Sequence, residues 1–200
     1  MEDIVFLNGK FIAAHKAQLP VLAPGSLFGW GCFETMRAYR GHIVYLAGHL
    51  ARIKNSAQAL SIRLSYSAEE LKKLILRTIA CNGHADSYVR LTILKSIRGT
   101  DTLIEARNYI PYPVRKYNTG FAACLSRMRQ NESSLLAQHK TTNRLIYQLA
   151  LSEAARKNCD EAVILNNRGY LAEGSRSNIF FTQGRALYTP ALACGCLGGI

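Results

Sequence analysis

In the first half of the chain, alternating apolar and polar positions predict an antiparallel sheet. In "IVFLNGKFIA" (4–13) the dipeptide Asn8-Gly9 stands between two apolar runs, which is the strongest short-range signal for a β-hairpin. Arg40-Gly41 repeats this arrangement further along the chain. We expect strands on both sides of it and again before residue 111, at 32–39, 42–46, 87–95 and 103–110.

Two segments with apolar residues at helical spacing, 47–60 and 67–81, predict amphipathic helices between these strands. The second segment opens with "SAEE", a capping box in which Ser67 and Glu70 satisfy each other's backbone N–H groups. Strands and helices together predict an α+β fold, in which residues 1–115 form a small N-terminal domain.

The segment "PYPVRKYNTG" (111–120) carries two prolines and a glycine and breaks both periodicities, so we expect the interdomain linker there. Beyond it, residues 121–200 predict a β-rich domain with a helix near 143–157. Thr142 or Asn143 would supply the N-cap of that helix. The expected strands are 121–126, 160–166, 170–172, 178–182 and 186–188.

The last residues of the chain, "TPALACGCLGGI", contain no closing helix and no charged tail. We therefore expect 121–200 to be the first part of a larger, truncated domain.

Composition is that of an ordinary globular protein, with 48% hydrophobic and 19% charged residues. No apolar run is long enough to span a membrane and no secretory signal is visible, so we expect a cytoplasmic protein without a membrane partner. The formal net charge of +12 leaves a polyanion-binding protein as an alternative. The basic residues are dispersed and match no nucleic-acid-binding module, so no nucleic-acid partner is expected.

The six cysteines are scattered among apolar neighbours. None forms a CxxC pair, and no histidine cluster lies at zinc-binding spacing. We expect reduced, mostly buried thiols and no metal site.

Lys140 lies in a short polar segment just before the helix expected near 143–157. It is either a solvated lysine or an amine that forms a Schiff base with a carbonyl cofactor. Glu173 supplies the partner that such chemistry needs. It ends a short apolar strand before a Gly-Ser loop, where a carboxylate can keep a pyridine nitrogen protonated and make the ring an electron sink.

Arg52 is the third candidate. In "GHLARIKNSAQAL" (48–60) it shares one helical face with His49, Ser56 and Ala59 and so can point inward. It is either a surface cation or a guanidinium fork that binds a phosphate at two points.

Six pieces of the sequence, taken in order, resemble the class IV aminotransferases. These pyridoxal-phosphate enzymes include branched-chain aminotransferases, D-amino acid aminotransferases and aminodeoxychorismate lyases. The resemblance extends from the first hairpin to the last residue and includes a lysine and a glutamate 33 positions apart (173 − 140). It implies the two-domain fold of that family. The pieces are "FGWGCFETMRAYRG", "HLARIKNSA", "YVRLT", "KTTNRL", "DEAVILNNRGYLAEGSRSNIFF" and "LYTP".

This resemblance assigns roles to the candidate residues. It implies that Lys140 holds pyridoxal 5′-phosphate and shuttles the substrate proton, that Glu173 contacts the pyridine nitrogen, and that Arg52 binds the phosphate. The backbone N–H of Ile200 would join the phosphate site. The branched-chain branch usually has a tyrosine shortly after the lysine, where this chain has Leu145.

The substrate is predicted from "SYVR" (87–90), which looks like the Tyr-x-Arg strand of branched-chain aminotransferases. Arg90 would receive the side carboxylate of glutamate or 2-oxoglutarate, unless it is an ordinary exposed cation. Phe33, Phe28 and Tyr112 would form apolar walls for a branched side chain. We therefore expect amino transfer between a branched-chain L-amino acid and 2-oxoglutarate.

Other functions remain open at this point. "HKTTNRL" is also close to the corresponding stretch of aminodeoxychorismate lyases, which eliminate pyruvate. A D-amino acid aminotransferase would carry its carboxylate-binding arginine further along the strand, where this chain has Ile93, Leu94 and Lys95. Outside the family stand a non-catalytic fragment and the polyanion binder. The resemblance also implies a homodimer, with a loop near 98–103 reaching the partner's active site.

Overall fold

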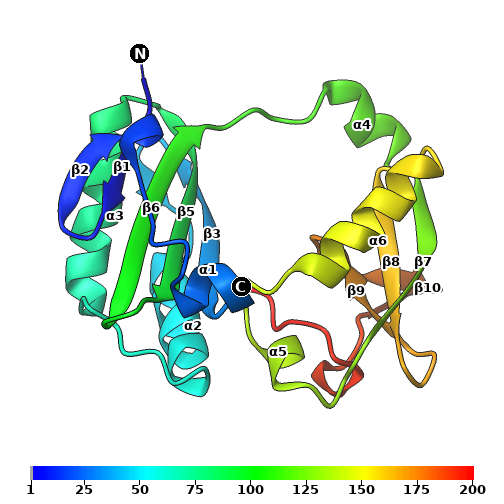
Figure 1. The fold of residues 1–200 in the computed structure, drawn as a ribbon. Helices are drawn as coiled ribbons and strands as arrows, with labels where there is room; N and C mark the ends of the chain where they lie inside the picture. Colours follow the sequence, from blue (N-terminus) through cyan, green and yellow to red (C-terminus); the bar gives the residue numbers. More distant parts are fainter. Residues whose placement is uncertain (1) are drawn as a thin grey trace. The chain divides into compact units, whose positions relative to one another are not determined.

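A computed structural model describes residues 2–200 of the chain. The chain divides into two compact units (Figure 1). The first comprises the residues up to Ile110 together with Lys140–Asn143 and Ile200, and the second comprises Pro111–His139 and Arg144–Gly199. The Lys140 segment therefore belongs to the N-terminal unit although it lies far from it in the sequence.

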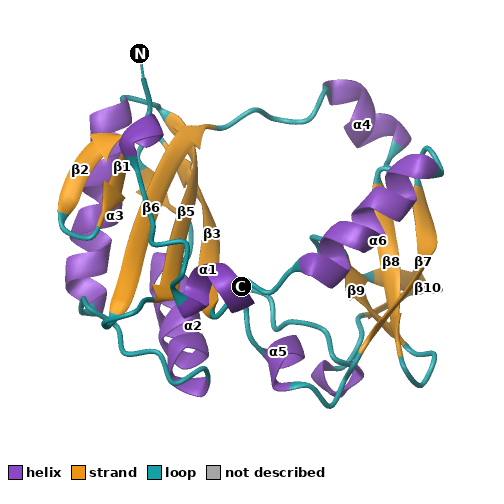
Figure 2. Cartoon of the chain, viewed as in Figure 1, coloured by secondary structure: helices purple, strands orange, loops and turns teal. Residues whose placement is uncertain are grey.

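The N-terminal unit is an α+β structure. Its elements, in chain order, are β1 (Ile4–Leu7), β2 (Lys10–Ala13), η1 (Ala14–Lys16), α1 (Pro24–Phe28), β3 (Gly31–Tyr39), β4 (His42–Ile43), α2 (Leu46–Ala59), α3 (Ala68–Asn82), β5 (Asp86–Lys95) and β6 (Thr100–Asn108). The strands form one antiparallel sheet in the order β2-β1-β6-β5-β3-β4 (Figure 2). Helices α2 and α3 pack their buried residues against this sheet and form the core with it.

Both predicted hairpins of this unit are confirmed. Leu7 pairs with Lys10 across Asn8-Gly9, and both turn residues have positive φ, as the tight hairpin turn requires. Arg40-Gly41 forms the second turn in the same way, between β3 and β4. Strand β4 is shorter than predicted because the left-handed residue Tyr45 turns the chain directly into α2.

The capping box at the start of α3 is confirmed as well. The Ser67 side chain accepts a hydrogen bond from the Glu70 N–H, and the Glu70 carboxylate accepts one from the Ser67 N–H at 2.7 Å. These reciprocal bonds satisfy two backbone donors that the first turn of a helix leaves without partners. The local sequence therefore determines where this helix begins.

The C-terminal unit combines a small mixed sheet with a helix. Its elements are α4 (Val114–Thr119), β7 (Ala123–Gln130), α5 (Leu135–Gln138), α6 (Leu145–Arg156), β8 (Glu161–Asn166), β9 (Leu171–Gly174), β10 (Phe181–Gln183), β11 (Ala186–Tyr188) and η2 (Leu192–Cys194). Strand β8 is parallel to β7 and antiparallel to β9, while β10 and β11 form a separate hairpin. Helix α4 occupies most of the stretch predicted as a linker.

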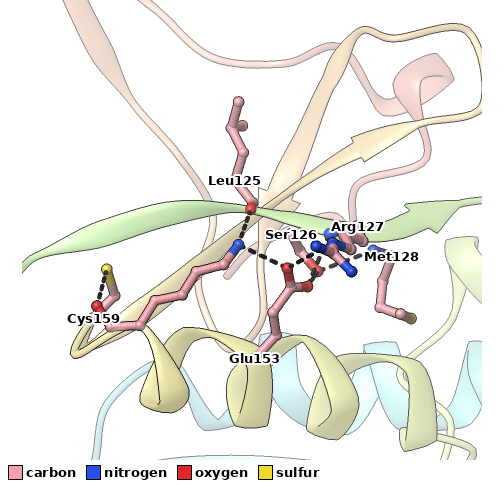
Figure 3. A network of polar contacts seen from close by, with 7 residues as sticks. Leu125, Ser126, Arg127, Met128, Glu153 and Cys159 are labelled. Atoms are coloured by element: carbon pink, nitrogen blue, oxygen red, sulfur yellow. Dashed lines mark hydrogen bonds and ion pairs between the residues drawn. The ribbon is translucent and has the colours of Figure 1, made fainter.

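Helix α6 is fixed to β7 by a polar network around Glu153 (Figure 3). The buried Glu153 carboxylate accepts hydrogen bonds from the Ser126 hydroxyl and the Arg127 N–H, both at 2.9 Å, and from the Lys157 ammonium at 2.8 Å. These partners, Lys157 first, lower the pKa of the Glu153 carboxyl to about 2. The helix thus carries a charged anchor on the face that packs on the sheet.

The buried face of α6 differs from the face that its apolar residues predict. Tyr147 and Glu153 are buried, whereas Leu145 and Leu149 are 66% and 47% exposed. The reason is that both buried side chains have hydrogen-bond partners on neighbouring strands, which apolar periodicity does not include.

Between residues 2 and 200, no helix is both long and apolar enough to cross a lipid bilayer.

Candidate active site

The backbone around Lys140 is anchored to the edge of β3. The Phe33 N–H donates to the Lys140 carbonyl and the Thr142 N–H donates to the Gly31 carbonyl, both at 2.9 Å. The Thr142 hydroxyl donates to the Gly29 carbonyl at 2.7 Å. These bonds fix the main chain on both sides of Lys140, so only side-chain rotation moves its amine.

The predicted cap of the following helix is wrong. Helix α6 begins at Leu145, and its N-cap is Arg144, whose side chain makes no capping hydrogen bond. Thr142 does not serve as the cap because its hydroxyl donates to the Gly29 carbonyl and its N–H donates to the Gly31 carbonyl, at the start of β3. A tertiary contact has replaced a local one.

Phe33 brings two of the predicted residues together. The Lys140 Nζ lies 5.0 Å from the centroid of the Phe33 ring, and the Arg90 guanidinium carbon lies 3.8 Å from it. Phe33 itself is only 6% exposed, and it stands opposite Thr92 in the β3–β5 register. The Arg90 Nε donates to the Thr92 hydroxyl at 3.1 Å, which orients the guanidinium over the ring. One aromatic ring therefore has an amine and a guanidinium group close to it.

Arg52 contacts a carboxylate of the protein itself. Its Nε and one terminal nitrogen each lie 2.6 Å from an oxygen of Glu34, in a bidentate ion pair between α2 and β3. The His49 Nδ1 lies 2.7 Å from the same carboxylate, which confirms that His49 and Arg52 share the inward face of α2. The phosphate contact of Arg52 stays a prediction.

Glu34 is fully buried, so its charge is costly without these partners. Burial raises the pKa of the Glu34 carboxyl, but the hydrogen bonds and charges of Arg52 and His49 outweigh it and leave the pKa below its ordinary value. Burial together with the Glu34 charge raises the pKa of the neighbouring Cys32 thiol to about 12. Cys32 is therefore a packed thiol and not a nucleophile at neutral pH.

Glu173 lies at the end of β9 in the C-terminal unit and is 4% exposed. Its Oε1 accepts a hydrogen bond from the Tyr147 hydroxyl at 2.7 Å, and its Oε2 accepts one from the Leu197 N–H at 3.1 Å. Burial and the Glu173 charge together raise the pKa of the Tyr147 phenol. Within residues 2–200, Glu173 forms no ion pair. It is a buried acid with neutral donors only.

Arg144 packs on Tyr147 and on the loop that follows Glu173. Its guanidinium carbon is 3.3 Å from the centroid of the Tyr147 ring, and one of its nitrogens donates to the Ser175 carbonyl at 3.0 Å. These contacts hold α6 next to the loop that follows Glu173. Leu145, the residue in place of the tyrosine of the branched-chain branch, is largely exposed.

The other predicted residues are less enclosed. Phe28, at the end of α1, is 69% exposed, and Tyr112 packs edge-on against Phe121 with ring centroids 4.9 Å apart. Ile200 belongs to the N-terminal unit, where its side chain lies next to Gly48. Their roles in substrate and phosphate binding stay predictions.

Sequence reasoning missed Glu34 and Tyr147. Glu34 could have been noticed, because it lies in the same row as the apolar residues Cys32, Met36 and Ala38 on one buried face of β3. A charged residue in such a row needs a buried partner. Tyr147 gave no comparable signal, since a tyrosine on the apolar face of a helix usually packs as a hydrophobe.

No metal site competes with this arrangement in the described part of the chain. Residues 2–200 contain no group of three or more histidine, cysteine, aspartate or glutamate side chains placed to bind a metal ion. Within the same residues all six cysteines are free thiols, but only Cys32 and Cys196 are buried, so the prediction of mostly buried thiols is wrong.

The fold is that of a known enzyme class. The family model for amino-transferase class IV matches residues 31–200. The solved branched-chain aminotransferase of the archaeon Thermoproteus uzoniensis, with norvaline, superposes on the whole chain with a TM-score of 0.92. It is 31% identical, and the chain covers 72% of its length. The chain therefore belongs to the class IV aminotransferases.

Two curated relatives represent different reactions within this class. A putative branched-chain-amino-acid aminotransferase of Methanocaldococcus jannaschii is 31% identical, and the match covers 98% of this chain and 71% of that protein. An aminodeoxychorismate lyase of Bacillus subtilis is 26% identical, and the match covers 98% of this chain and 70% of that protein. Similarity is greater to the branched-chain relative, and both matches extend over nearly the whole chain.

Proposed function

We propose that this protein uses pyridoxal 5′-phosphate to transfer an amino group between a branched-chain L-amino acid and 2-oxoglutarate. The observation that carries the proposal is the Phe33 ring with Lys140 and Arg90 close to it. An amine that reacts with a carbonyl group and a guanidinium that binds a carboxylate are the two groups this reaction requires from the N-terminal unit. The branched-chain relative and the solved branched-chain aminotransferase support the choice of substrate.

The residues present fit the cofactor chemically. Glu173 is a buried carboxylate with two neutral hydrogen-bond donors and, within residues 2–200, no ion pair. Such a group is suited to accept the N–H of a cationic pyridine ring, which would supply the missing positive charge. When bound, pyridoxal 5′-phosphate supplies an electron-withdrawing ring that stabilises the negative charge developing on the substrate.

Each residue of the chain then has a defined part in the reaction. The Lys140 amine would bind the cofactor carbonyl. Once released by the incoming amino acid, it would move the proton between the substrate Cα and C4′ of the cofactor. Glu173 would keep the ring nitrogen protonated, while Arg52 and the Ile200 N–H would bind the phosphate. Arg90 would bind the side carboxylate of glutamate or 2-oxoglutarate, and Phe33 would face the branched side chain.

The second candidate is elimination of pyruvate from aminodeoxychorismate, which the similarity to the 26% identical Bacillus subtilis lyase supports. The same lysine and carboxylate would serve both reactions, so the two differ in the substrate groups that Arg90 must bind. A homodimer, in which the loop near 98–103 reaches the partner's site, and a cytoplasmic location complete the proposal.

The cofactor site can be tested by absorbance and covalent trapping. The protein is mixed with pyridoxal 5′-phosphate, its visible spectrum is recorded, and borohydride reduction is followed by peptide mapping. We expect a visible band and a pyridoxyl group on Lys140, both lost in Lys140→Ala. Lys72→Ala, which removes an exposed lysine of α3, is the matched control and should leave both unchanged.

The substrate follows from a turnover assay of the same protein. L-valine, L-leucine and L-isoleucine with 2-oxoglutarate are compared with D-amino acids and with aminodeoxychorismate. We expect amino transfer from the branched-chain L-amino acids alone. Pyruvate release from aminodeoxychorismate would favour the lyase.

The trapping experiment can also contradict the proposal. If the pyridoxyl label were spread over many lysines and no visible band appeared, Lys140 would not be the cofactor site.

A further inference from the structure

We propose that Tyr147 is a positioning residue that orients the Glu173 carboxylate toward the ring nitrogen of the cofactor. This inference rests on the proposed function. It concerns a residue of α6 that makes no contact assigned to cofactor or substrate above. Its role would be exerted entirely through Glu173, by fixing the rotation of the carboxylate.

The direction of each hydrogen bond follows from the partners. The Gly195 carbonyl can only accept, so the Gln130 atom that lies 3.2 Å from it must be the amide nitrogen. The same nitrogen lies 2.7 Å from the Tyr147 oxygen and donates its second hydrogen there. The phenol is then left to donate its single proton to Glu173, at 2.7 Å. One backbone carbonyl thus sets the polarity of the whole chain of bonds.

The carboxylate is held from both sides. Tyr147 donates to Oε1 and the Leu197 N–H donates to Oε2, so each oxygen has one fixed donor. A carboxylate offers about four acceptor sites, and two therefore stay available for another donor. Because both oxygens are pinned, rotation of the carboxylate about its last side-chain bond is restricted. A third donor would meet an acceptor that is already oriented.

The charges around the Glu173 carboxylate favour a cation as its third hydrogen-bond donor. All of its donors are neutral: the Tyr147 phenol, the Gln130 amide and the Leu197 peptide N–H. Burial and Glu173 raise the pKa of the phenol and keep it protonated, so it donates a hydrogen bond without neutralising the carboxylate. Within residues 2–200 the buried negative charge accepts hydrogen bonds from neutral groups and forms no ion pair, and a protonated ring nitrogen would neutralise it.

The test measures preference between two cofactors. Pyridoxal 5′-phosphate and its 1-deaza analogue, in which C–H replaces the ring nitrogen, are titrated by calorimetry into the unmodified protein and into Tyr147→Phe. Without the phenol, the Glu173 carboxylate loses one of its two donors and can rotate, so the preference for the cofactor with a ring nitrogen should fall about tenfold. Tyr170→Phe, which alters an exposed tyrosine of the same unit, is the control and should keep the preference.

A second variant checks the chain of bonds. Gln130→Leu leaves the phenol in place but removes the donor that sets its direction, so the preference should fall in the same sense and by less. Equal weakening of both cofactors in Tyr147→Phe would reduce Tyr147 to a packing role and overturn the inference, as would an unchanged preference. If the unmodified protein binds neither cofactor on Lys140, it is the proposed function that fails.

Discussion

Glu34 and Glu173 are both buried acids, and they are satisfied in opposite ways. Glu34, in the N-terminal unit, accepts two hydrogen bonds from the Arg52 guanidinium and contacts His49. Glu173, in the C-terminal unit, accepts hydrogen bonds from the phenol of Tyr147 and from a backbone N–H. The first charge is neutralised inside the protein, and the second is only solvated by dipoles.

The difference indicates what each acid is for. An acid that is paired with a guanidinium has no need of an external cation, so Glu34 is a structural group that fixes α2 on β3 and holds Arg52 in place. An acid that is oriented but not neutralised is suited to bind a positively charged ligand. We therefore expect a carboxylate of this second kind, and not burial alone, to indicate a binding site.

Breaking the N-terminal pair should have the largest effect on stability. Glu34→Gln leaves the Arg52 guanidinium partly buried without its counter-charge, and we expect a loss of about 3 kcal/mol in the free energy of unfolding. Trp30 is the single tryptophan of the chain and belongs to this unit, so its fluorescence in a urea titration reports the loss.

A double variant separates charge from packing. In Glu34→Gln/Arg52→Met both charges of the pair are removed, and part of the lost stability should return. If the double variant were instead less stable than Glu34→Gln, the unpaired charge of Arg52 would not be the cause of the stability lost in the single variant.

Glu153 is intermediate, because its carboxylate combines two neutral donors with the Lys157 ammonium at 2.8 Å and a longer ion pair to the Arg127 guanidinium at 3.9 Å. Its pKa is lowered from 4.5 to about 2, so the folded state gains stability above pH 4.5 and loses it as the pH falls toward 2. In Glu153→Gln that loss should be smaller. The two proteins should therefore differ most in urea midpoint near pH 7 and converge near pH 2.

Far-UV circular dichroism at a series of pH values measures these midpoints. Glu69→Gln, which changes an exposed acid of α3, serves as the control and should follow the unmodified protein. A constant difference between Glu153→Gln and the unmodified protein at every pH would assign the effect to packing and not to the lowered pKa.

Removing the charge of Glu173 should have the smallest effect on stability. Glu173→Gln keeps the shape and removes a buried charge that has no ion pair within residues 2–200, so the free energy of unfolding without cofactor should change by less than about 1 kcal/mol. Hydrogen exchange of the C-terminal unit measures this. The stabilisation produced by added pyridoxal 5′-phosphate should nevertheless fall. A loss as large as that of Glu34→Gln would remove the contrast between the two acids.

Much of the fold could be predicted from local patterns. Asn8-Gly9 and Arg40-Gly41 form tight turns with positive φ at both residues, and the Ser67 and Glu70 pair starts α3. The family motifs also led to Lys140, Arg90 and Phe33, which the structure places together. In these cases the determining residues are neighbours in the sequence or belong to a recognised motif.

The tertiary structure alone decided how the site residues are held. Thr142 pairs with Gly29 and Gly31, more than 100 positions away, instead of capping α6. Glu34 receives Arg52, and Tyr147 reaches Glu173 across 26 positions. Helix and strand periodicity records only which face of an element is apolar. Which donor meets which acceptor depends on how strands and helices pack, and therefore on contacts between residues that are distant in the sequence.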